Sequence, residues 1–270
     1  MLIDTHCHLD AAEFNVDRDY IALMAKQQGV NRIVIPAVER ANFDTVIALC
    51  NRHQNCAYAL GIHPMYVDAA VNQDIETLKT YIENFHPIAI GEIGLDYFVR
   101  TPKLNPEQIE KQVIFFTQQL KIAAHYDLPV LLHVRHAVDD VLKYLRRHPV
   151  CGGIAHAFNG SLQQAEQFIA LGFKLGFGGA MTYSRALKIR ELAVKLPLDA
   201  IVLETDAPDM PPAWIGPGVR NSPLELLKIA QVLADLRQIN VAQVHAVTGC
   251  NALHALPKLA ELCTSPQVLH

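Results

Sequence analysis

Eight short runs of nearly continuous apolar residues recur along the chain, separated by longer stretches in which apolar residues return every three or four positions. The runs lie at Leu2–His6, Arg32–Pro36, Ala57–Ile62, Ile88–Ile93, Val130–Val134, Gly153–Ala157, Phe173–Phe177 and Ile201–Thr205. Uninterrupted apolar runs are typical of parallel strands that are buried on both faces. Their regular alternation with helical stretches predicts an α/β fold, a single (β/α)8 barrel of the TIM type.

The helical pattern is clearest after the fourth run, where apolar residues between 109 and 123 form one stripe. Asn105 precedes this stripe and Gln108 follows three residues later, the spacing of a capping box. Ser222 and Glu225 show the same spacing before another apolar series. We therefore predict helices that begin after Asn105 and after Ser222.

Composition agrees with an ordered globular protein. The 270 residues are 51% hydrophobic and 19% charged, with no change of composition along the chain, which predicts one domain over residues 1–270. No apolar run approaches the roughly 20 residues that cross a bilayer, so we expect no membrane association. Six scattered cysteines without a CxxC pair favour reduced thiols and a cytoplasmic location. Nothing in the sequence indicates an obligate protein partner.

Side chains that bind metals fall at or near the C-terminal ends of the predicted strands. They are His6, His8, Glu92, His133, His156 and Asp206. In a barrel these ends meet at one rim, where active sites are built. Each residue taken alone could instead be a hydrogen-bonded core histidine or a helix cap. Their coincidence at one rim therefore carries the prediction of a metal site.

Seven motifs spread over the chain form a specific set. They are IDTHCHLD at 3–10, GIHP at 61–64, GEIGLDY at 91–97, LPVLLHVR at 128–135, HAFNGS at 156–161, LGFGG at 175–179 and LETDAP at 203–208. With them the chain resembles the amidohydrolase superfamily and, within it, the TatD family of metal-dependent deoxyribonucleases, in particular its YjjV-like branch.

The resemblance implies two divalent cations per chain. His6 and His8 would bind one cation and His133 and His156 the other, while Glu92 would bridge the two. Asp206 would bind the first cation, face the attacking water and take its proton. A shared carboxylate relieves the repulsion between two cations that lie about 3.5–4 Å apart. This set of ligands suits Zn²⁺ or Mn²⁺ better than Mg²⁺, although the sequence leaves the metal open.

The activity implied is two-metal hydrolysis of phosphodiester bonds from an end of single-stranded DNA, with Asp206, Glu92 and His63 as catalytic residues. By resemblance, His63 would contact the scissile phosphate; it could instead be an ordinary turn histidine before Pro64. Arg135 lies two residues beyond His133 and could bind a phosphate. A salt bridge to a neighbouring carboxylate is the other interpretation of Arg135.

Two other functions stay open at this point. A small phosphoester, ester or amide could be the substrate, because the net charge is −4 and no basic run is present. A non-catalytic metal-binding module is disfavoured, because a structural site would lack a base such as Asp206.

The segment around the eighth predicted strand holds two further candidates. Glu204 lies two residues before Asp206 and is expected to support a metal ligand. The loop Ala207–Asn221 holds four prolines and the only tryptophan, Trp214. Long loops in compact domains usually have a function. Trp214 could stack on a terminal base or simply pack the loop against the barrel.

Overall fold

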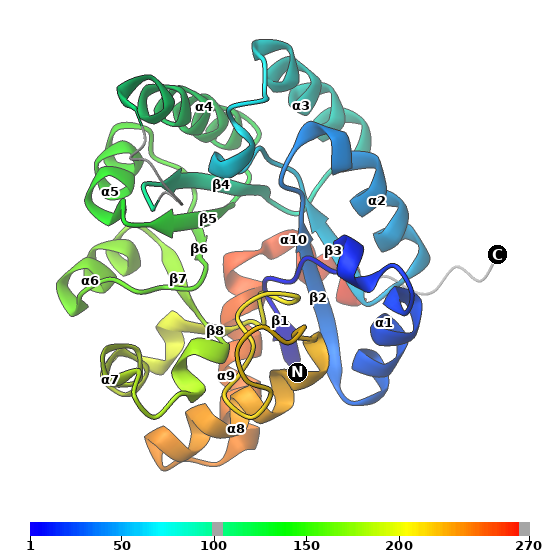
Figure 1. The fold of residues 1–270 in the computed structure, drawn as a ribbon, viewed down its shortest axis with the longest axis vertical. Helices are drawn as coiled ribbons and strands as arrows, with labels where there is room; N and C mark the ends of the chain where they lie inside the picture. The colour runs from blue at the N-terminus through cyan, green and yellow to red at the C-terminus, as the bar shows by residue number, and fades with distance from the viewer. Residues whose placement is uncertain (99–104, 265–270) are drawn as a thin grey trace.

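The computed structural model describes residues 1–98 and 105–264, and its strands form a ring with helices outside (Figure 1). The strands are β1 Leu2–Asp4, β2 Val30–Pro36, β3 Cys56–Ala59, β4 Ile90–Asp96, β5 Val130–Arg135, β6 Gly153–Ala155, β7 Phe173–Phe177 and β8 Ile201–Leu203. Parallel pairing joins consecutive strands into two sheets, with the orders β1-β2-β3 and β4-β5-β6-β7-β8. Leu60 pairs with Ile90, and the Thr5 amide donates to the Leu203 carbonyl at 3.1 Å. These contacts join the two sheets, and the predicted TIM-type barrel is confirmed.

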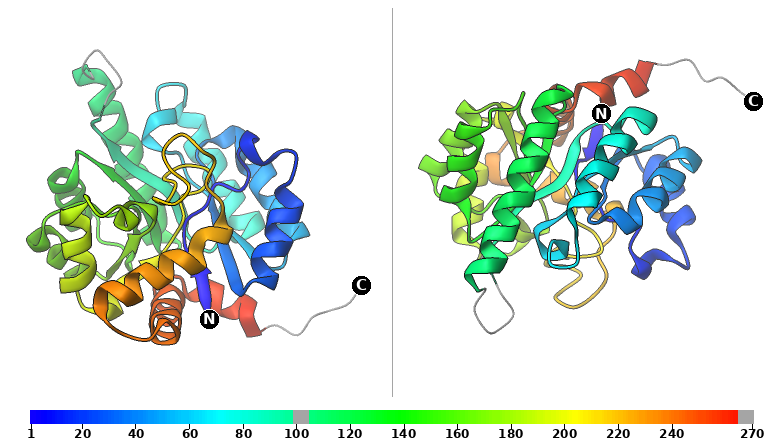
Figure 2. Two further views of the ribbon diagram at one scale, coloured as in Figure 1. Left: turned by 60° about the horizontal axis from the view of Figure 1, so that its bottom comes forward. Right: turned by 90° about the horizontal axis from the view of Figure 1, so that it is seen from above.

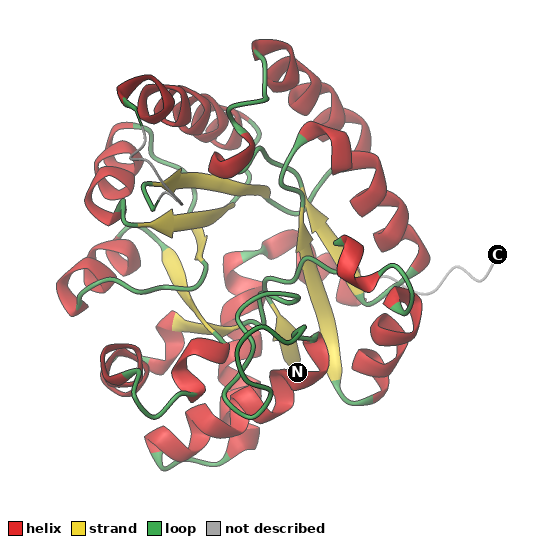
Figure 3. Cartoon of the chain, in the orientation of Figure 1, coloured by secondary structure: helices red, strands yellow, loops and turns green. Residues whose placement is uncertain are grey.

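Helices surround the strands on the outside (Figure 3). They are α1 Arg18–Gln27, α2 Phe43–Arg52, α3 Asn72–Phe85, α4 Pro106–His125, α5 Val138–Arg147, α6 Leu162–Ala170, α7 Leu187–Lys195, α8 Leu226–Arg237, α9 Val241–Ala255 and α10 Pro257–Thr264. Short 3-10 helices, such as η3 Pro64–Tyr66 and η6 Pro223–Glu225, lie between the main elements. None of the described helices is both long and apolar enough to cross a membrane.

Inside the barrel, polar side chains form a layer at the mouth, and an apolar layer fills the opposite end. Ile3, Leu131, Ile154 and Val202 belong to one buried cluster, which also contains residues of α9 and α10. These helices lie at the opposite end of the barrel from the loop 207–221 (Figure 2). Because residues two apart in a strand point to the same side, Leu131 is followed inside the barrel by His133. The apolar layer therefore forms the floor on which the polar side chains at the mouth rest.

Several strand ends differ from the prediction in ways that concern the site. The first strand ends at Asp4 and the sixth at Ala155, so His6, His8 and His156 lie just beyond their strands rather than inside them. Strand β4 continues to Asp96, whereas the sequence pattern placed its end at Ile93. Apolar runs do not mark these ends, because polar residues such as His6, Asp96 and His156 are buried at the mouth like the strand residues before them.

The two predicted helix starts have different outcomes. Asn105 caps α4 as expected, with Gln108 completing the capping box. Ser222 instead caps the 3-10 helix η6, and α8 begins only at Leu226. Glu225 does not complete a capping box; its Oε2 accepts a hydrogen bond from the Trp214 indole at 2.6 Å.

The cysteines described by the structure are free thiols. Cys7, Cys50 and Cys56 are buried, and Cys151 and Cys250 are exposed. The side chain of Cys263 lies outside the described residues.

Gly94 in β4 permits the close approach of β5, and we predict that Gly94→Ala destabilises the barrel. Gly94 has φ +151, and a Cβ atom there would lie 1.9 Å from the His133 carbonyl oxygen. Strain and overpacking should lower the free energy of unfolding by at least about 2 kcal/mol in urea denaturation. Gly29, with φ +96 and nothing within 4 Å of a built Cβ, is the control; Gly29→Ala should cost only about 1 kcal/mol. Equal losses would contradict this account.

Candidate metal centre

The carboxylate of Glu92 lies at the centre of a ring of imidazoles. Its Oε2 is 3.1 Å from His6 Nε2 and 3.4 Å from His8 Nε2. Its Oε1 is 3.0 Å from His133 Nδ1 and 3.2 Å from His156 Nε2. The side chain of Glu92 is only 2% exposed. The two carboxylate oxygens thus face different histidines, the arrangement expected of a carboxylate that bridges two cations.

Asp206 completes the first half of this centre. Its Oδ1 lies 3.7 Å from His6 Nε2 and 3.8 Å from His8 Nε2. The Asp206 amide donates to the His6 carbonyl at 2.8 Å, and its backbone adopts the left-handed conformation with φ +55. A non-glycine residue in this conformation is costly unless its surroundings hold it there. The surrounding fold therefore holds the Asp206 carboxylate beside His6 and His8.

Two carboxylates outside this ring of histidines orient the second pair, His133 and His156. Asp96 Oδ2 is 2.9 Å from His133 Nε2, and Glu204 Oε1 is 3.5 Å from His156 Nδ1. Metal-binding histidines usually donate their second ring N–H to such a carboxylate. His133 and His156 thus present one nitrogen to Glu92 and the other to a supporting acid, which fits a metal site. Gly176 provides room for Glu204, since a Cβ there would lie 2.1 Å from its Oε2.

The sequence analysis did not predict a role for Asp96. It belongs to the motif GEIGLDY, but the expected end of the strand at Ile93 left it in a loop. Counting alternate residues from Glu92 would have found it, since 92, 94 and 96 share a face of an extended strand. Glu204, by contrast, lies against a predicted ligand as expected.

His63 also reaches Glu92, although it was expected as a catalytic residue that contacts the substrate phosphate and not as a neighbour of this carboxylate. Its Nε2 is 3.5 Å from Glu92 Oε1. Its Nδ1 accepts a hydrogen bond from the Met65 amide at 3.1 Å. A neutral imidazole that accepts at Nδ1 carries its proton on Nε2. His63 therefore offers a hydrogen-bond donor to the centre of the site, which suits contact with an anionic oxygen better than metal binding.

The possible ligand groups overlap rather than separate cleanly. Ligand atoms within 4.8 Å of one another group as His6, His156 and Asp206; as His6, His8 and Glu92; and as His63, Glu92 and His133. The rings of His6 and His156 stack with their centroids 3.9 Å apart. All six predicted ligands thus lie together, while the assignment of each histidine to one of two cations stays a prediction.

Protonation of the histidines follows from these contacts. Burial lowers the pKa of His6 to about 3 and that of His63 to about 4. Burial also opposes the charged form of His8, but hydrogen bonding to Glu92 and the charges of Glu92 and Asp206 raise its pKa to about 9. Burial opposes the charged form of His133 too, yet its hydrogen bonds to Asp96 and Glu92 raise its pKa. Cations would have to displace protons from such histidines, so metal binding should release protons.

Asp4 is a second residue that the sequence analysis did not single out. It is fully buried, and its carboxylate accepts hydrogen bonds from the Thr205 amide at 2.9 Å and the Thr205 hydroxyl at 2.6 Å. The His6 amide donates to the same carboxylate at 3.3 Å. Burial raises the pKa of Asp4 to about 8, against these hydrogen bonds. Asp4 thus joins the segment that carries His6 to the segment that carries Asp206.

Arg135 lies at the rim without the salt bridge that was one interpretation of it. No carboxylate lies within ion-pair distance of its guanidinium in the part of the chain that the structure describes. Instead the guanidinium carbon lies 3.8 Å from the centroid of the Phe98 ring. Among the described residues, the guanidinium of Arg135 is therefore stacked on an aromatic ring and not paired with a carboxylate.

The loop 207–221 is held firmly against the barrel. Arg220 forms two hydrogen bonds to the Asp17 carboxylate at 2.7 and 2.6 Å. The buried Asn221 donates to the Thr205 carbonyl at 2.8 Å. Trp214 is 41% exposed, but its indole N–H is bonded to Glu225. These contacts favour the interpretation of Trp214 as an anchor of the loop.

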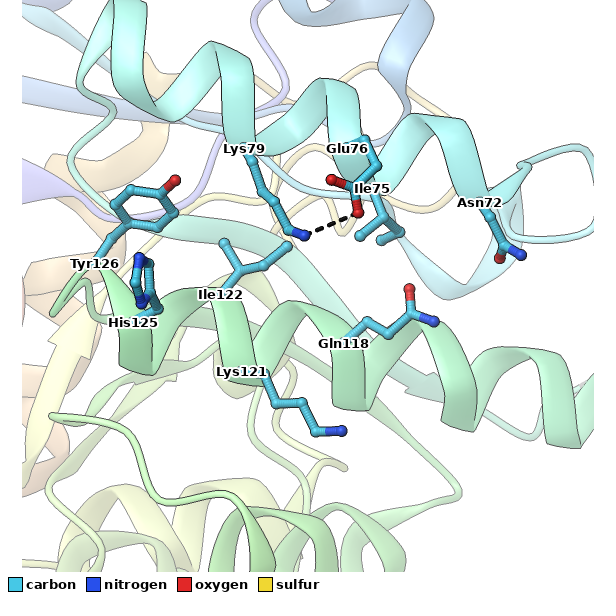
Figure 4. A pocket seen from close by; sticks show the side chains of 9 residues that line it. All are labelled: Asn72, Ile75, Glu76, Lys79, Gln118, Lys121, Ile122, His125 and Tyr126. Atoms are coloured by element: carbon cyan, nitrogen blue, oxygen red, sulfur yellow. Dashed lines mark hydrogen bonds and ion pairs between the residues drawn. The ribbon is translucent and has the colours of Figure 1, made fainter.

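A separate hollow of about 490 Å³ lies between α3 and α4 (Figure 4). Ile75 and Ile122 line it, and Lys79 at its edge is paired with Glu76 at 2.8 Å. None of its lining residues belongs to a ligand group. The chemistry therefore lies at the barrel mouth.

Comparison with known proteins agrees with this geometry. The sequence profile of TatD-related DNases matches residues 3–256. The chain belongs to this family. It is 43% identical to the uncharacterized metal-dependent hydrolase YjjV of Escherichia coli K12 over 239 residues, 87% of this chain and 90% of that protein. It is 36% identical to an uncharacterized metal-dependent hydrolase of Haemophilus influenzae over 256 residues, 92% of this chain and 97% of that protein.

A solved structure shows the same relationship. The crystal structure of YjjV, a TatD homologue from Escherichia coli K12, superposes with a TM-score of 0.89 at 39% identity, covering 95% of this chain and 98% of that one. The resemblance to the TatD family and its YjjV-like branch is confirmed. The chain is thus a metal-dependent hydrolase of the TatD family, with His, Asp and Glu side chains grouped to bind metal.

We predict that Asp4→Ala destabilises the protein strongly. The change leaves the buried amide and hydroxyl of Thr205 without their acceptor, which should lower the free energy of unfolding by about 2–4 kcal/mol. Asp19, whose side chain is 62% exposed in a pair with His53, provides the control. Asp19→Ala should cost about 1 kcal/mol or less. Chemical denaturation of both variants measures the difference, and similar losses would show that Asp4 does not join the two segments.

Proposed function

We propose that this protein hydrolyses phosphodiester bonds at an end of single-stranded DNA, using two divalent cations bound at the barrel mouth. The observation that carries this proposal is the division of the Glu92 carboxylate between two sets of histidines. His6 and His8 face Oε2, and His133 and His156 face Oε1.

The residues around Glu92 fit two cations. His6, His8 and Asp206 would hold one, His133 and His156 the other, and Glu92 would separate them. Two such cations would activate a water molecule and neutralise charge on the phosphate oxygens. Asp96 and Glu204 would keep the ligand nitrogens of His133 and His156 aimed at the centre.

Asp206 is the carboxylate best placed to accept a proton from water. Its side chain is 14% exposed, whereas that of Glu92 is 2% exposed and enclosed by histidines. Water entering from the mouth can therefore reach Asp206. In this proposal Asp206 orients the attacking water and takes its proton.

His63 and Arg135 would bind the phosphate. His63 directs its Nε2 proton into the site, because its Nδ1 is occupied by the Met65 amide. Arg135 is exposed at the rim with no ion pair to give up among the described residues. Donors aimed at phosphate oxygens stabilise the charge that develops during displacement.

DNA as the substrate is supported by membership of the TatD-related DNase family. The net charge of −4 argues against a broad contact with nucleic acid. Only one or two phosphates would therefore be bound, close to the cations. The same charge favours, as the second candidate, a small phosphoester substrate at the same site.

The test is hydrolysis of labelled single-stranded oligonucleotides by metal-stripped protein, with Zn²⁺, Mn²⁺ or Mg²⁺ added back. Parallel assays with p-nitrophenyl phosphoesters, simple esters and amides measure the alternatives. We expect metal-dependent release of nucleotides from one end. A kcat/KM for a small ester or amide well above that for every oligonucleotide would overturn the nuclease proposal.

Glu92→Gln should remove one equivalent of metal and lower kcat by orders of magnitude. The amide lacks the charge that separates two cations, while its size and shape leave the fold intact. Metal content by mass spectrometry and turnover of the best substrate test this, with circular dichroism as the control for folding. Two equivalents retained with normal turnover would contradict the two-cation proposal.

Asp206→Asn should lower kcat by about 10²–10⁴-fold, the usual contribution of proton transfer, with a much smaller change in KM. Steady-state kinetics at equal metal loading separate the two effects. A variant impaired only in KM would show that Asp206 positions the substrate and does not take the proton.

A further inference from the structure

Three exposed side chains meet at the rim beside the second half of the metal centre. The Phe98 ring is 44% exposed and lies under the Arg135 guanidinium, 3.8 Å from its carbon. The His136 ring lies 5.1 Å from the Phe98 ring at an interplanar angle of 40°. Together these residues, named here the rim stack, present aromatic surface and positive charge to solvent.

The rim stack is connected to the metal centre through one carboxylate. Asp96 Oδ1 accepts a hydrogen bond from the Phe98 amide at 2.8 Å, while its Oδ2 holds His133 at 2.9 Å. Asp96 and Arg135 are also paired in the ladder between β4 and β5. The position of the rim stack is therefore fixed relative to His133.

Burial in the described core does not account for these three residues, which are all exposed. Phe98 lies outside the buried clusters of the barrel. Arg135 has no carboxylate partner in the described ranges 1–98 and 105–264. His136 has the left-handed backbone with φ +56, a costly conformation for an exposed residue. An exposed phenylalanine beside a free guanidinium instead has the chemistry that binds nucleotides, a face for a base and a fork for a phosphate.

We propose that the rim stack is a nucleotide subsite. The base of a nucleotide next to the scissile phosphate stacks on Phe98 and His136, while Arg135 binds the phosphate of that nucleotide. This inference rests on the proposed function and deepens it, because it makes a substrate with bases preferable to a bare phosphoester. It also assigns base binding to this rim rather than to Trp214.

The test measures binding separately from hydrolysis. The probes are a short single-stranded phosphorothioate oligonucleotide, which resists cleavage, and an abasic phosphorothioate of the same length. Both are titrated by fluorescence anisotropy with the metal-loaded protein. Stacking predicts that the wild-type protein binds the base-bearing probe about 5- to 150-fold more tightly. Phe98→Ala should abolish this preference and Phe98→Tyr should retain it.

Phe85 provides the matched control, because it is 41% exposed at the C-terminal end of α3. Phe85→Ala should leave the preference unchanged. Arg135→Ala should reduce the salt dependence of binding by about 0.7 in log–log slope, one phosphate contact on a single strand. Arg147→Ala, at the last turn of α5, should leave the slope unchanged.

Wild-type protein that binds neither probe, or does not distinguish them, would overturn the rim stack as a base subsite. So would Phe98→Ala protein that keeps the preference. Protein that hydrolyses oligonucleotides but binds the base-bearing and abasic probes equally would leave the nuclease proposal standing. It would remove only this inference. A preference that depends on Phe98, in protein that hydrolyses no oligonucleotide with any metal, would support the subsite and remove the nuclease proposal.

Discussion

The carboxylate of Glu92 is withdrawn from solvent and placed among five imidazoles, and the rest of the site is arranged around that fact. An ionised carboxylate buried without partners is very costly. Burial opposes its charge, but its contacts with the surrounding histidines hold the pKa of Glu92 well below its usual range. The same histidines can exchange their protons for metal ions. A buried carboxylate whose two oxygens face different histidines is therefore the basis of the two-cation proposal.

The barrel holds Glu92 and its histidines in place through the apolar layer and through supporting carboxylates. The apolar layer that includes Leu131, together with α9 and α10, fills the end opposite the mouth. Asp4 joins the chain around His6 to Thr205, next to Asp206. Asp96 and Glu204 orient two of the histidines from outside the ring. Supporting carboxylates of this kind hold metal-binding histidines in one orientation.

The sequence predicted the eight strands, and all six expected ligands lie at the mouth of the barrel. The apolar runs and their spacing carry that information, because a closed barrel brings the strand ends to one rim whatever their separation along the chain. Asp4 was not predicted, because its role depends on hydrogen bonds to Thr205 that no local pattern records. Asp96 was not predicted, because the fourth strand was expected to end at Ile93. The contact of Phe98 with Arg135 was not predicted either, because it joins residues that are distant in the sequence. Trp214, the only tryptophan, was a candidate for stacking on a base, yet its indole N–H is bound to Glu225.

The most direct test of the central claim is a crystal structure of the metal-loaded protein with anomalous scattering measured at the metal absorption edge. The account predicts two peaks about 3.5–4 Å apart at the barrel mouth. One oxygen of Glu92 should bind each metal, with His6 and His8 on one side and His133 and His156 on the other. A single peak, or two peaks without Glu92 between them, would contradict the account.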